Sequence, residues 1–447
     1  MLWQDIEIWE VKMKTFNNFY EEVISLPNLY KAFERAKKGK KKRRVLSFEK
    51  NLHENLLNLH IELKDKEYKP RPYFTFYITD YKKRKIMCPD FRDSVVQHAI
   101  FIYLEQMYEP FFIYDSYACR IEKGTHKAFK RLKKFVNKHS KDDYFMKCDI
   151  SKYFYSIDHY KLKEILRKKI KDENVLWLLN SIIDSHYEEE MPSHIENNKE
   201  LKQEKGIPIG NLTSQLLANI YLNELDYFAK HELRIKYYLR YVDDFVILGK
   251  SYKEMKEFYI KIKEFLSKNL FLKLEEKKTQ INKISFGVDF VGYVCFKRII
   301  RVRSRNFRRF TKELKKKSYL FYNEELTLEK LSESVLSYIG HISHTNSRKV
   351  LENVIYRYYS VIAGKAVQRG GNWNNGASAG PFCANLNNAP SNVNNNIGFR
   401  CCSVQKVKII PSRRYYMPYA QMQLHSQNEN MSRDITDKNF VISAMTL

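Results

Sequence analysis

The chain alternates short apolar runs with longer amphipathic stretches, and the two patterns predict different elements. Runs rich in aromatic and β-branched residues predict strands at 73–78, 144–150, 272–274 and 286–295, and on both sides of residues 243–244. A helical period of hydrophobic positions predicts helices over 1–70, 93–109, 126–138, 159–171, 173–186, 213–226, 252–270 and 301–360. The middle of the chain therefore alternates strands and helices.

Polar and glycine-containing stretches separate these elements. Gly124 and Thr125 are typical of a turn and N-cap, and Gly206–Gly210 opens the helix that begins near residue 213. The acidic, polar stretch 187–203 is expected to be a loop. The composition changes abruptly near residue 363: residues 369–400 are rich in Asn and nearly uncharged, and residues 403–447 show no clear periodicity.

Two adjacent carboxylates, Asp243 and Asp244, interrupt an otherwise apolar stretch over residues 239–248. One interpretation is a surface hairpin, since Asp is common in turns. The other is a divalent-metal site, because two neighbouring carboxylates in a buried sheet need a cation. The metal interpretation needs a third carboxylate, and Asp149 ends the predicted strand 144–148. Such a set could hold two Mg²⁺ ions about 3.5–4 Å apart, as in enzymes that transfer phosphoryl groups.

Phe154 follows Asp149 by five residues. A bulky ring at this position could lie under the sugar of an incoming nucleotide and exclude a 2′-hydroxyl. The alternative is an ordinary core position for Phe154.

Charge and cysteine content narrow the functional classes. The formal net charge is +27, from 79 Lys and Arg against 52 Asp and Glu, which favours a polyanionic partner such as nucleic acid. General solubility, or a Lys-rich codon bias, would explain the same excess. The seven cysteines form no CxxC pair, so neither a zinc site nor a disulfide framework is expected from them. No apolar run of 18 residues and no apolar signal core is present, so we expect a cytoplasmic protein with no membrane contact.

Seven sequence blocks occur in a fixed order over roughly residues 70–345. They are Arg84–Pro89 with Arg92–Gln97, Ser116–Arg120 with Gly124–His126, the Asp149–Phe154 block, Gly206–Gln215, Tyr241–Asp244, Leu274–Thr279, and Phe290–Tyr293. Together they resemble a reverse transcriptase of the bacterial, group II intron-like lineage. The Tyr-x-Asp-Asp motif alone would be a weak match, but the ordered set is specific.

The resemblance implies an α+β fold of the right-hand polymerase type, with fingers, an antiparallel ferredoxin-like palm and a helical thumb. Its expected boundaries are residues 1–143 for the N-terminal helices and fingers, 144–296 for the palm (with part of the fingers in 159–215), 297–362 for the thumb, and 363–447 for a poorly ordered tail. It also implies RNA-directed DNA polymerase activity with two Mg²⁺ ions, which Mn²⁺ can replace.

The resemblance also assigns site residues. Asp149, Asp243 and Asp244, with Ile150 next to them, would bind the metals, and Lys277 or Lys278 would protonate the pyrophosphate. The deoxynucleoside triphosphate (dNTP) site would use Arg84, Lys85, Phe154, Ile209, Gly210 and Gln215. The primer and template would be contacted through Phe290, Gly292, Tyr293, Arg92 and Ser214. The basic helices 301–360 would lie on the duplex.

The glycine block indicates a subtype. Many reverse transcriptases have Gln-Gly and Ser-Pro where this chain has Ile209-Gly210 and Ser214-Gln215. This form resembles the enzymes of diversity-generating retroelements. Such enzymes copy a template-repeat RNA into cDNA with errors at adenines, in mutagenic retrohoming, and they work with an oligomeric accessory variability protein. Loss of an amide beside the nascent pair accounts for lower fidelity but not for selectivity at adenine.

The Asn-rich tail favours the same subtype. Residues 369–402 resemble the variable end of a retroelement target protein, and Asn codons can lose either adenine without becoming stop codons. We hypothesise that this stretch is the template repeat translated in the frame of the enzyme, so that it is passive as protein. The alternatives are a low-complexity linker and a ligand-binding module, for which the tail is short.

Two other functional classes stay open at this stage. One is a group II intron, retron or phage-defence reverse transcriptase without adenine mutagenesis. The other is a non-catalytic nucleic-acid binder on a polymerase fold, which the presence of all three aspartates disfavours.

Overall fold

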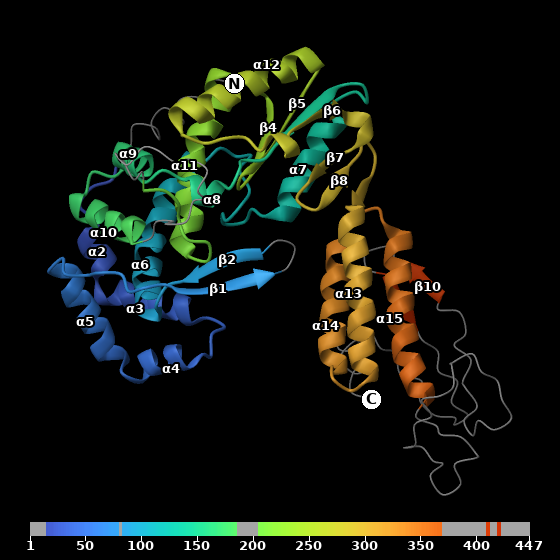
Figure 1. The fold of residues 1–447 in the computed structure, drawn as a ribbon, viewed down its shortest axis with the longest axis horizontal. Coiled ribbons are helices and arrows are strands. Elements are labelled where there is room, and N and C mark those ends of the chain that lie inside the picture. Colours follow the sequence, from blue (N-terminus) through green and yellow to red (C-terminus); the bar gives the residue numbers. More distant parts are fainter. Residues whose placement is uncertain (1–14, 80–82, 186–203, 369–407, 412–417, 422–447) are drawn as a thin grey trace, which may run out of the picture. The chain divides into compact units, whose positions relative to one another are not determined.

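A computed structural model describes residues 15–79, 83–185, 204–368, 408–411 and 418–421. The chain forms two compact units, Met1–Val291 and Gly292–Leu447 (Figure 1). Helices and antiparallel sheets are both present, so the predicted mixture of helix and sheet is confirmed.

Most of the helices belong to the first unit, and they form in the stretches with a helical period. In chain order they are α2 (Tyr20–Ile24), α3 (Leu26–Lys37), α4 (Arg43–Lys50), α5 (Leu52–Lys64), α6 (Phe91–Tyr108), α7 (Thr125–Asn137), α8 (Tyr153–Ser156), α9 (His159–Lys169), α10 (Glu173–Asp184), α11 (Leu212–Tyr227) and α12 (Tyr252–Asn269). A 3₁₀ turn at Glu109–Phe111 follows α6, and a π-helical turn at Phe228–Glu232 follows α11. Two further 3₁₀ turns, Glu276–Lys278 and Ile284–Phe286, lie before and after residues 280–283.

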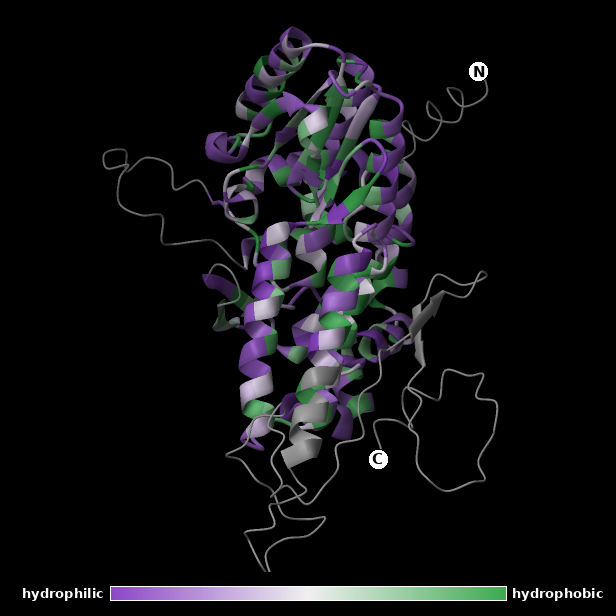
Figure 2. Cartoon of the chain, turned by 90° about the vertical axis from the view of Figure 1, so that its right-hand side faces the viewer, coloured by the Kyte–Doolittle hydropathy of each residue, from purple (hydrophilic) through white to green (hydrophobic). Residues whose placement is uncertain are grey.

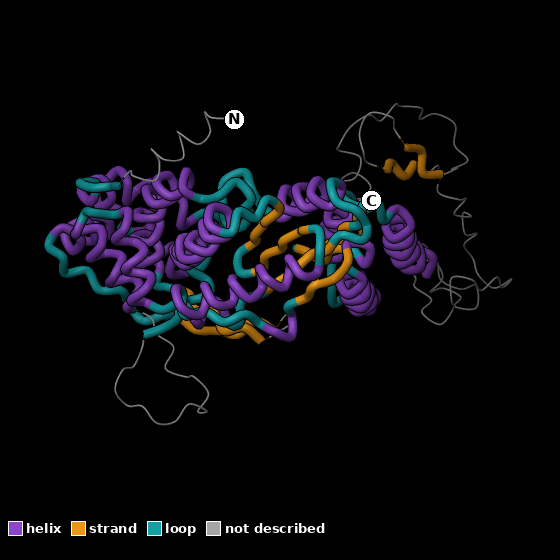
Figure 3. The backbone as a smooth tube through the Cα atoms, turned by 90° about the horizontal axis from the view of Figure 1, so that it is seen from above, coloured by secondary structure: helices purple, strands orange, loops and turns teal. Residues whose placement is uncertain are grey.

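A four-stranded antiparallel sheet organises this unit. Its spatial order is β4 (Tyr237–Tyr241), β5 (Asp244–Gly249), β3 (Tyr144–Cys148) and β6 (Gln280–Lys283). A separate hairpin pairs β1 (Phe74–Thr79) with β2 (Lys83–Cys88). Figure 3 shows the strands of the sheet gathered among the helices.

Two helices with few exposed positions build the core beside the sheet. Helices α6 and α11 pack on each other, and α11 also contacts α9 and α12. Both are apolar around most of their circumference, as expected for interior helices. Helix α12 instead has one apolar stripe, which contacts β3, β5 and β6. A buried layer of helices therefore supports the sheet.

The second unit contains a small sheet and a helical bundle. Its elements are β8 (Tyr293–Cys295), β9 (Ile300–Val302), α13 (Ser304–Tyr322), α14 (Leu328–Ile342), α15 (Arg348–Gln368) and the short pair β10 (Lys408–Pro411) and β11 (Pro418–Gln421). Phe310 and Tyr338 stack with ring centroids 3.8 Å apart and join α13 to α14. Hydrophilic and hydrophobic positions are interspersed along the helices in Figure 2, and α13 and α14 each bury one apolar face.

Some predicted elements differ from those observed. The strand predicted at 272–274 is wrong: Leu274 makes only an isolated bridge to Ile150, and the strand that pairs with β3 is β6. Two leucines at alternate positions anchor an extended connection to the core without a ladder. The stretch predicted as one strand at 286–295 is split between β7 (Val288–Phe290) and β8 by a turn at Val291 and Gly292, where φ is 44° and 91°.

Other predictions fall partly outside the described residues. The loop predicted at 187–203 lies there, as does nearly all of the tail; the pair β10–β11 is the described part of it. Helix α15 continues to Gln368, beyond the expected boundary at 362. No helix in the described part of the chain has both the length and the apolar character needed to cross a membrane.

Candidate active site

The Asp243-Asp244 pair lies at the tight turn between β4 and β5. Tyr241 pairs with Asp244 across the ladder, so Val242 and Asp243 form the turn itself. Val242 has φ of 55°, a left-handed conformation that is unusual for a β-branched residue. Both aspartates are half-buried. The alternative of an ordinary surface hairpin is therefore not supported.

Asp149 lies beside this turn because β3 pairs antiparallel with β5. The last pair of the ladder, Cys148 with Phe245, places Asp149 next to Asp244. The Asp149 carboxylate also acts as a hydrogen-bonding partner of Asp244. The structure thus brings together the three carboxylates that were predicted to lie close to one another. Ile150 follows them in the chain and is buried against Leu274.

The three carboxylates repel one another in a partly dehydrated site. Burial raises the pKa of Asp243 to about 6, and the charge of Asp149 adds to this rise. Burial also raises the pKa of Asp244; Lys147 opposes the rise, whereas Asp243 and Asp149 add to it. Oxygen-rich sites with excess negative charge suit a hard divalent cation, so the residues present fit a divalent metal centre.

Besides Lys147, two cationic side chains act on this cluster. Lys278 donates to the Asp149 carboxylate, and the Glu275 amide donates to the Asp149 main-chain oxygen over 2.8 Å. Of the two lysines proposed as an acid, Lys278 is therefore the one in contact with the cluster, although both lysines are exposed. Arg84 is exposed on β2, and its charge lowers the pKa of Asp243.

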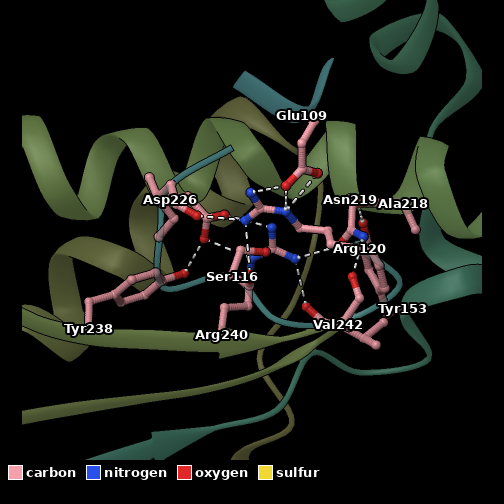
Figure 4. Close-up of polar contacts among 12 residues, drawn as sticks. Glu109, Ser116, Arg120, Tyr153, Ala218, Asn219, Asp226, Tyr238, Arg240 and Val242 are labelled. Carbon is pink, nitrogen blue, oxygen red and sulfur yellow. Dashed lines mark hydrogen bonds and ion pairs between the residues drawn. The ribbon is translucent and has the colours of Figure 1, made fainter. Parts of the chain in front are cut away.

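The sequence analysis missed a buried ion pair beneath the turn. Arg240 and Asp226 are fully buried, and the guanidinium donates to both carboxylate oxygens over 2.7 and 2.6 Å (Figure 4). The same guanidinium donates to the Asn219 side chain over 3.1 Å and to the carbonyl of Val242 over 3.0 Å. Arg240 is thus a positioning residue that holds the left-handed residue of the turn.

The main chain of Arg240 is held as firmly as its side chain. Its amide donates to the carbonyl of Asp115 over 2.9 Å, and its carbonyl accepts from the amide of Tyr117 over 3.1 Å. Asp115 is in turn paired with Arg131, and Arg120 with Glu109 (Figure 4 shows the second pair). The Ser116–Arg120 block therefore supports the strand that carries the aspartates. The sequence offered two signals of this pair: Arg240 lies inside an apolar strand, and Asp226 lies inside an apolar helix.

The residues proposed for the dNTP lie on three neighbouring segments. Phe154 is half-buried in α8, and its carbonyl accepts from the amide of Ile207 over 2.8 Å. The carbonyl of Ile209 accepts from the amide of Met87 on β2 over 2.9 Å, which joins the glycine block to the hairpin. Gly210 needs to be glycine: its φ is 126°, and a Cβ would lie 3.0 Å from Ile86 and Met87 atoms. Further along, Gln215 is exposed on α11, and Lys85 is half-buried on β2.

The side chains proposed for primer and template are mostly packed. Phe290 and Tyr293 are buried, and the Tyr293 hydroxyl bonds to His341 Nδ1 over 2.8 Å. Ser214 is buried in α11, and Arg92 pairs with Glu62 and Asp93.

The packed positions describe the protein without nucleic acid, so the expected contacts of these residues with primer and template stay predictions. Gly292 was expected to allow close approach of nucleic acid, which also stays a prediction. A Cβ at Gly292 would lie 3.2 Å from the Asn306 amide nitrogen.

Comparison with known proteins identifies a domain that contains the three aspartates. Residues 78–295 match the family model described as "Reverse transcriptase (RNA-dependent DNA polymerase)". The chain is 29% identical over 299 residues to the group II intron-encoded protein LtrA of Lactococcus lactis subsp. cremoris. The alignment covers 52% of this chain and 48% of LtrA. It is 28% identical over 284 residues to protein YkfC of Escherichia coli (strain K12), which covers 55% of this chain and 71% of YkfC. The chain thus spans about half the length of LtrA.

The buried ion pair gives a first prediction. Asp226→Leu alone should lower the free energy of unfolding by about 3–5 kcal/mol, because it leaves the Arg240 charge buried without a partner. The double variant Asp226→Leu/Arg240→Met should recover much of the lost stability, because no buried charge remains. It should still bind divalent ions more weakly than the parent, since the Val242 carbonyl has lost its hydrogen-bond donor. Urea unfolding and ion titration measure the two quantities.

The exposed pair Lys168–Glu224 provides the control. Lys168→Met should change stability by less than about 0.5 kcal/mol. If the double variant recovered both stability and ion affinity, Arg240 would have no positioning role.

The raised pKa of Asp243 gives a second prediction. Asp243 ionises near pH 6 in the folded chain but at its ordinary value of 3.8 in the unfolded chain. Between these pH values the folded chain binds the proton more tightly, so the free energy of unfolding falls as pH rises. In metal-free buffer, Asp243→Asn should therefore be more stable than the parent at pH 8, by about 1–2 kcal/mol, and equal to it near pH 4. Thermal unfolding against pH measures this. Asp142→Asn, at an exposed position, should show no such difference, and an unchanged Asp243→Asn profile would contradict the electrostatic model.

Proposed function

We propose that this chain, whose residues 78–295 are a reverse transcriptase domain similar to those of group II intron-encoded proteins, is an RNA-directed DNA polymerase. The observation that carries the proposal is the convergence of Asp149, Asp243 and Asp244 at one end of the central sheet. Under this proposal the substrates are an RNA template with its cDNA and dNTPs, and the reaction is nucleotidyl transfer to a primer 3′-hydroxyl.

The three aspartates would hold divalent ions, Mg²⁺ in the first instance with Mn²⁺ as a substitute, and Ile150 would add its carbonyl. When bound, such ions lower the pKa of the attacking hydroxyl and neutralise charge on the phosphates. The lysine on Asp149 has a second role in the proposal. Lys278 would move to the pyrophosphate and donate a proton to it.

The remaining residues of the proposed site bind and select the nucleotide. Arg84 is exposed on the paired strand β2, and its guanidinium fork suits triphosphate oxygens. Lys85 would add a second cation. Phe154 would exclude a ribose 2′-hydroxyl by steric conflict. The support for both assignments is that β2 and α8 are linked through the glycine block by the amides of Met87 and Ile207.

The domain assignments follow from the same proposal. Residues 1–143 would form the N-terminal helices and fingers, 144–296 the palm, and 297–362 the thumb. A basic thumb helix such as α13 would lie along the phosphate backbone, where Lys and Arg contacts are sequence-independent.

We further propose that the enzyme belongs to the diversity-generating type. Its support is the sequence Ile209-Gly210 with Ser214-Gln215, and the half-buried position of Ile209 beside the β1–β2 hairpin. An apolar side chain there cannot donate or accept a hydrogen bond at the templating pair. The Asn-rich residues 369–402 support the template-repeat hypothesis by sequence alone. An accessory variability protein is the expected partner of this type.

A second candidate is a group II intron-type reverse transcriptase without adenine mutagenesis. The observation in its favour is that LtrA is itself named a group II intron-encoded protein. Error spectra separate the two candidates.

Primer extension on an RNA template tests the activity. With Mg²⁺, the Asp243→Ala/Asp244→Ala variant should fall to background, and Lys278→Ala should be slower by about 10²–10⁴-fold, the usual contribution of a general acid. Lys277→Ala is the matched control and should keep most of the activity. Undiminished extension by the double aspartate variant would overturn the catalytic assignment of the aspartates. No extension by the parent would favour a non-catalytic nucleic-acid binder, and a larger loss in Lys277→Ala would reverse the choice of acid.

Sequencing of the cDNA tests the subtype. Ile209→Gln should lower misincorporation by about 2–10-fold, the factor that one restored hydrogen bond provides. The parent should make most errors opposite template adenine, and the other three template bases serve as the internal control. An even error spectrum in the parent would favour the group II intron type.

A further inference from the structure

A second group of possible metal ligands lies away from the aspartates. It contains His159 at the start of α9, Asp184 at the end of α10, and Glu204. One ligand atom from each lies within 4.8 Å of the other two. Asp184 and Glu204 are exposed, so their proximity alone would carry no argument, and the histidine decides the case.

The His159 ring is oriented like that of a metal ligand. Its Nε2 lies 2.7 Å from the carbonyl oxygen of Gly206, and a carbonyl can only accept, so Nε2 carries the proton. The lone pair of the neutral ring is then on Nδ1. The ring is 2% exposed, and Nδ1 has no hydrogen-bond partner among the described residues. Metal-bound histidines typically donate their other ring N–H in this way, which fixes the ring.

The two carboxylates face this unpartnered nitrogen. Asp184 Oδ1 lies 3.7 Å and Glu204 Oε2 3.9 Å from Nδ1, which is too far for a hydrogen bond. A lone pair opposite two carboxylates is unfavourable unless a cation lies between them. Lys163 approaches Asp184 Oδ1 to 2.5 Å from one side and compensates only that carboxylate.

We propose that His159 Nδ1, Asp184 and Glu204 form a binding site for a divalent transition metal, with Zn²⁺ as the best match. One imidazole and two carboxylates are a common zinc ligand set, and a tetrahedral ion at about 2.0–2.2 Å from each leaves its fourth position to water. The two nitrogen–oxygen distances need to close by only a few tenths of an ångström, which exposed carboxylates can do.

The site would act on the segment that leads to the glycine block. Glu204 and Asp184 flank residues 186–203, and the carbonyl of Glu204 accepts from the His159 amide over 3.1 Å. Gly206 follows at once, and its amide donates to Ile157 over 2.8 Å. An ion here would tie the ends of α9 and α10 to the start of residues 204–210. The proposal does not depend on polymerase activity.

Zinc binding by the full-length chain tests the proposal. Chelator-treated protein is titrated with Zn²⁺ against a competing dye, in excess Mg²⁺ so that the aspartate cluster is occupied. Thermal unfolding is followed in parallel. The parent should bind one Zn²⁺ more than Asp184→Asn or Glu204→Gln at the same free zinc, and its melting temperature should rise with zinc.

Matched variants separate the site from other zinc-binding side chains. Asp184→Asn and Glu204→Gln preserve shape at exposed positions and should still fold, with affinity lowered by more than about 10–100-fold. Glu164 lies on the same helix as His159 and pairs with Lys161. The control variant Glu164→Gln should bind Zn²⁺ like the parent. With Co²⁺, visible absorption bands of a four-coordinate ion should appear in the parent and be lost in His159→Gln.

Equal zinc affinity and stoichiometry in the parent, Asp184→Asn and Glu204→Gln would overturn the proposal. His159 would then be protonated on Nδ1 and paired with the carboxylates.

Discussion

The buried ion pair between Arg240 and Asp226 is the interaction on which the carboxylate site depends. Neither charge has access to water, so each is tolerable only because the other is in bidentate contact and because Asn219 and Val242 take the remaining donors. The pair fixes the position of α11 against β4. It also supplies the hydrogen bond that keeps Val242 in its left-handed conformation, and this conformation sets the direction of the two aspartates that follow.

The aspartate cluster is an electrostatically costly arrangement that a rigid frame keeps in place. Carboxylates free to move would separate, yet Asp149 is held by main-chain pairing of β3 on one side and Glu275 on the other. Lys278, Lys147 and Arg84 reduce the repulsion without removing it. The site therefore has an unsatisfied demand for positive charge, which is the property that a divalent ion and a triphosphate require.

The sequence predicted most of the elements and the proximity of the three aspartates, because hydrophobic period and a charged pair in an apolar strand are local signals. It did not predict β6 or β9, whose three or four residues are strands only through pairing with a neighbour. The role of Arg240 was missed because its partner Asp226 lies on a different element. Phe290 and Tyr293 were assigned to the primer because aromatic residues serve equally for packing and for stacking on nucleic acid. Both rings are buried in the structure, and their contact with a primer stays a prediction. The choice between Lys277 and Lys278 likewise needed the turn at Glu276–Lys278, which directs one lysine to Asp149.

The order of the strands in space has a consequence for folding during synthesis on the ribosome. Asp149 is synthesised early, yet the groups that hold it, Glu275 and Lys278, come much later in the chain, directly before β6. A chain still growing on the ribosome therefore carries Asp149 long before it can fix that carboxylate in place. Translation that stops anywhere before residue 283 leaves an incomplete sheet. Such truncated products would lack a complete frame for the three aspartates.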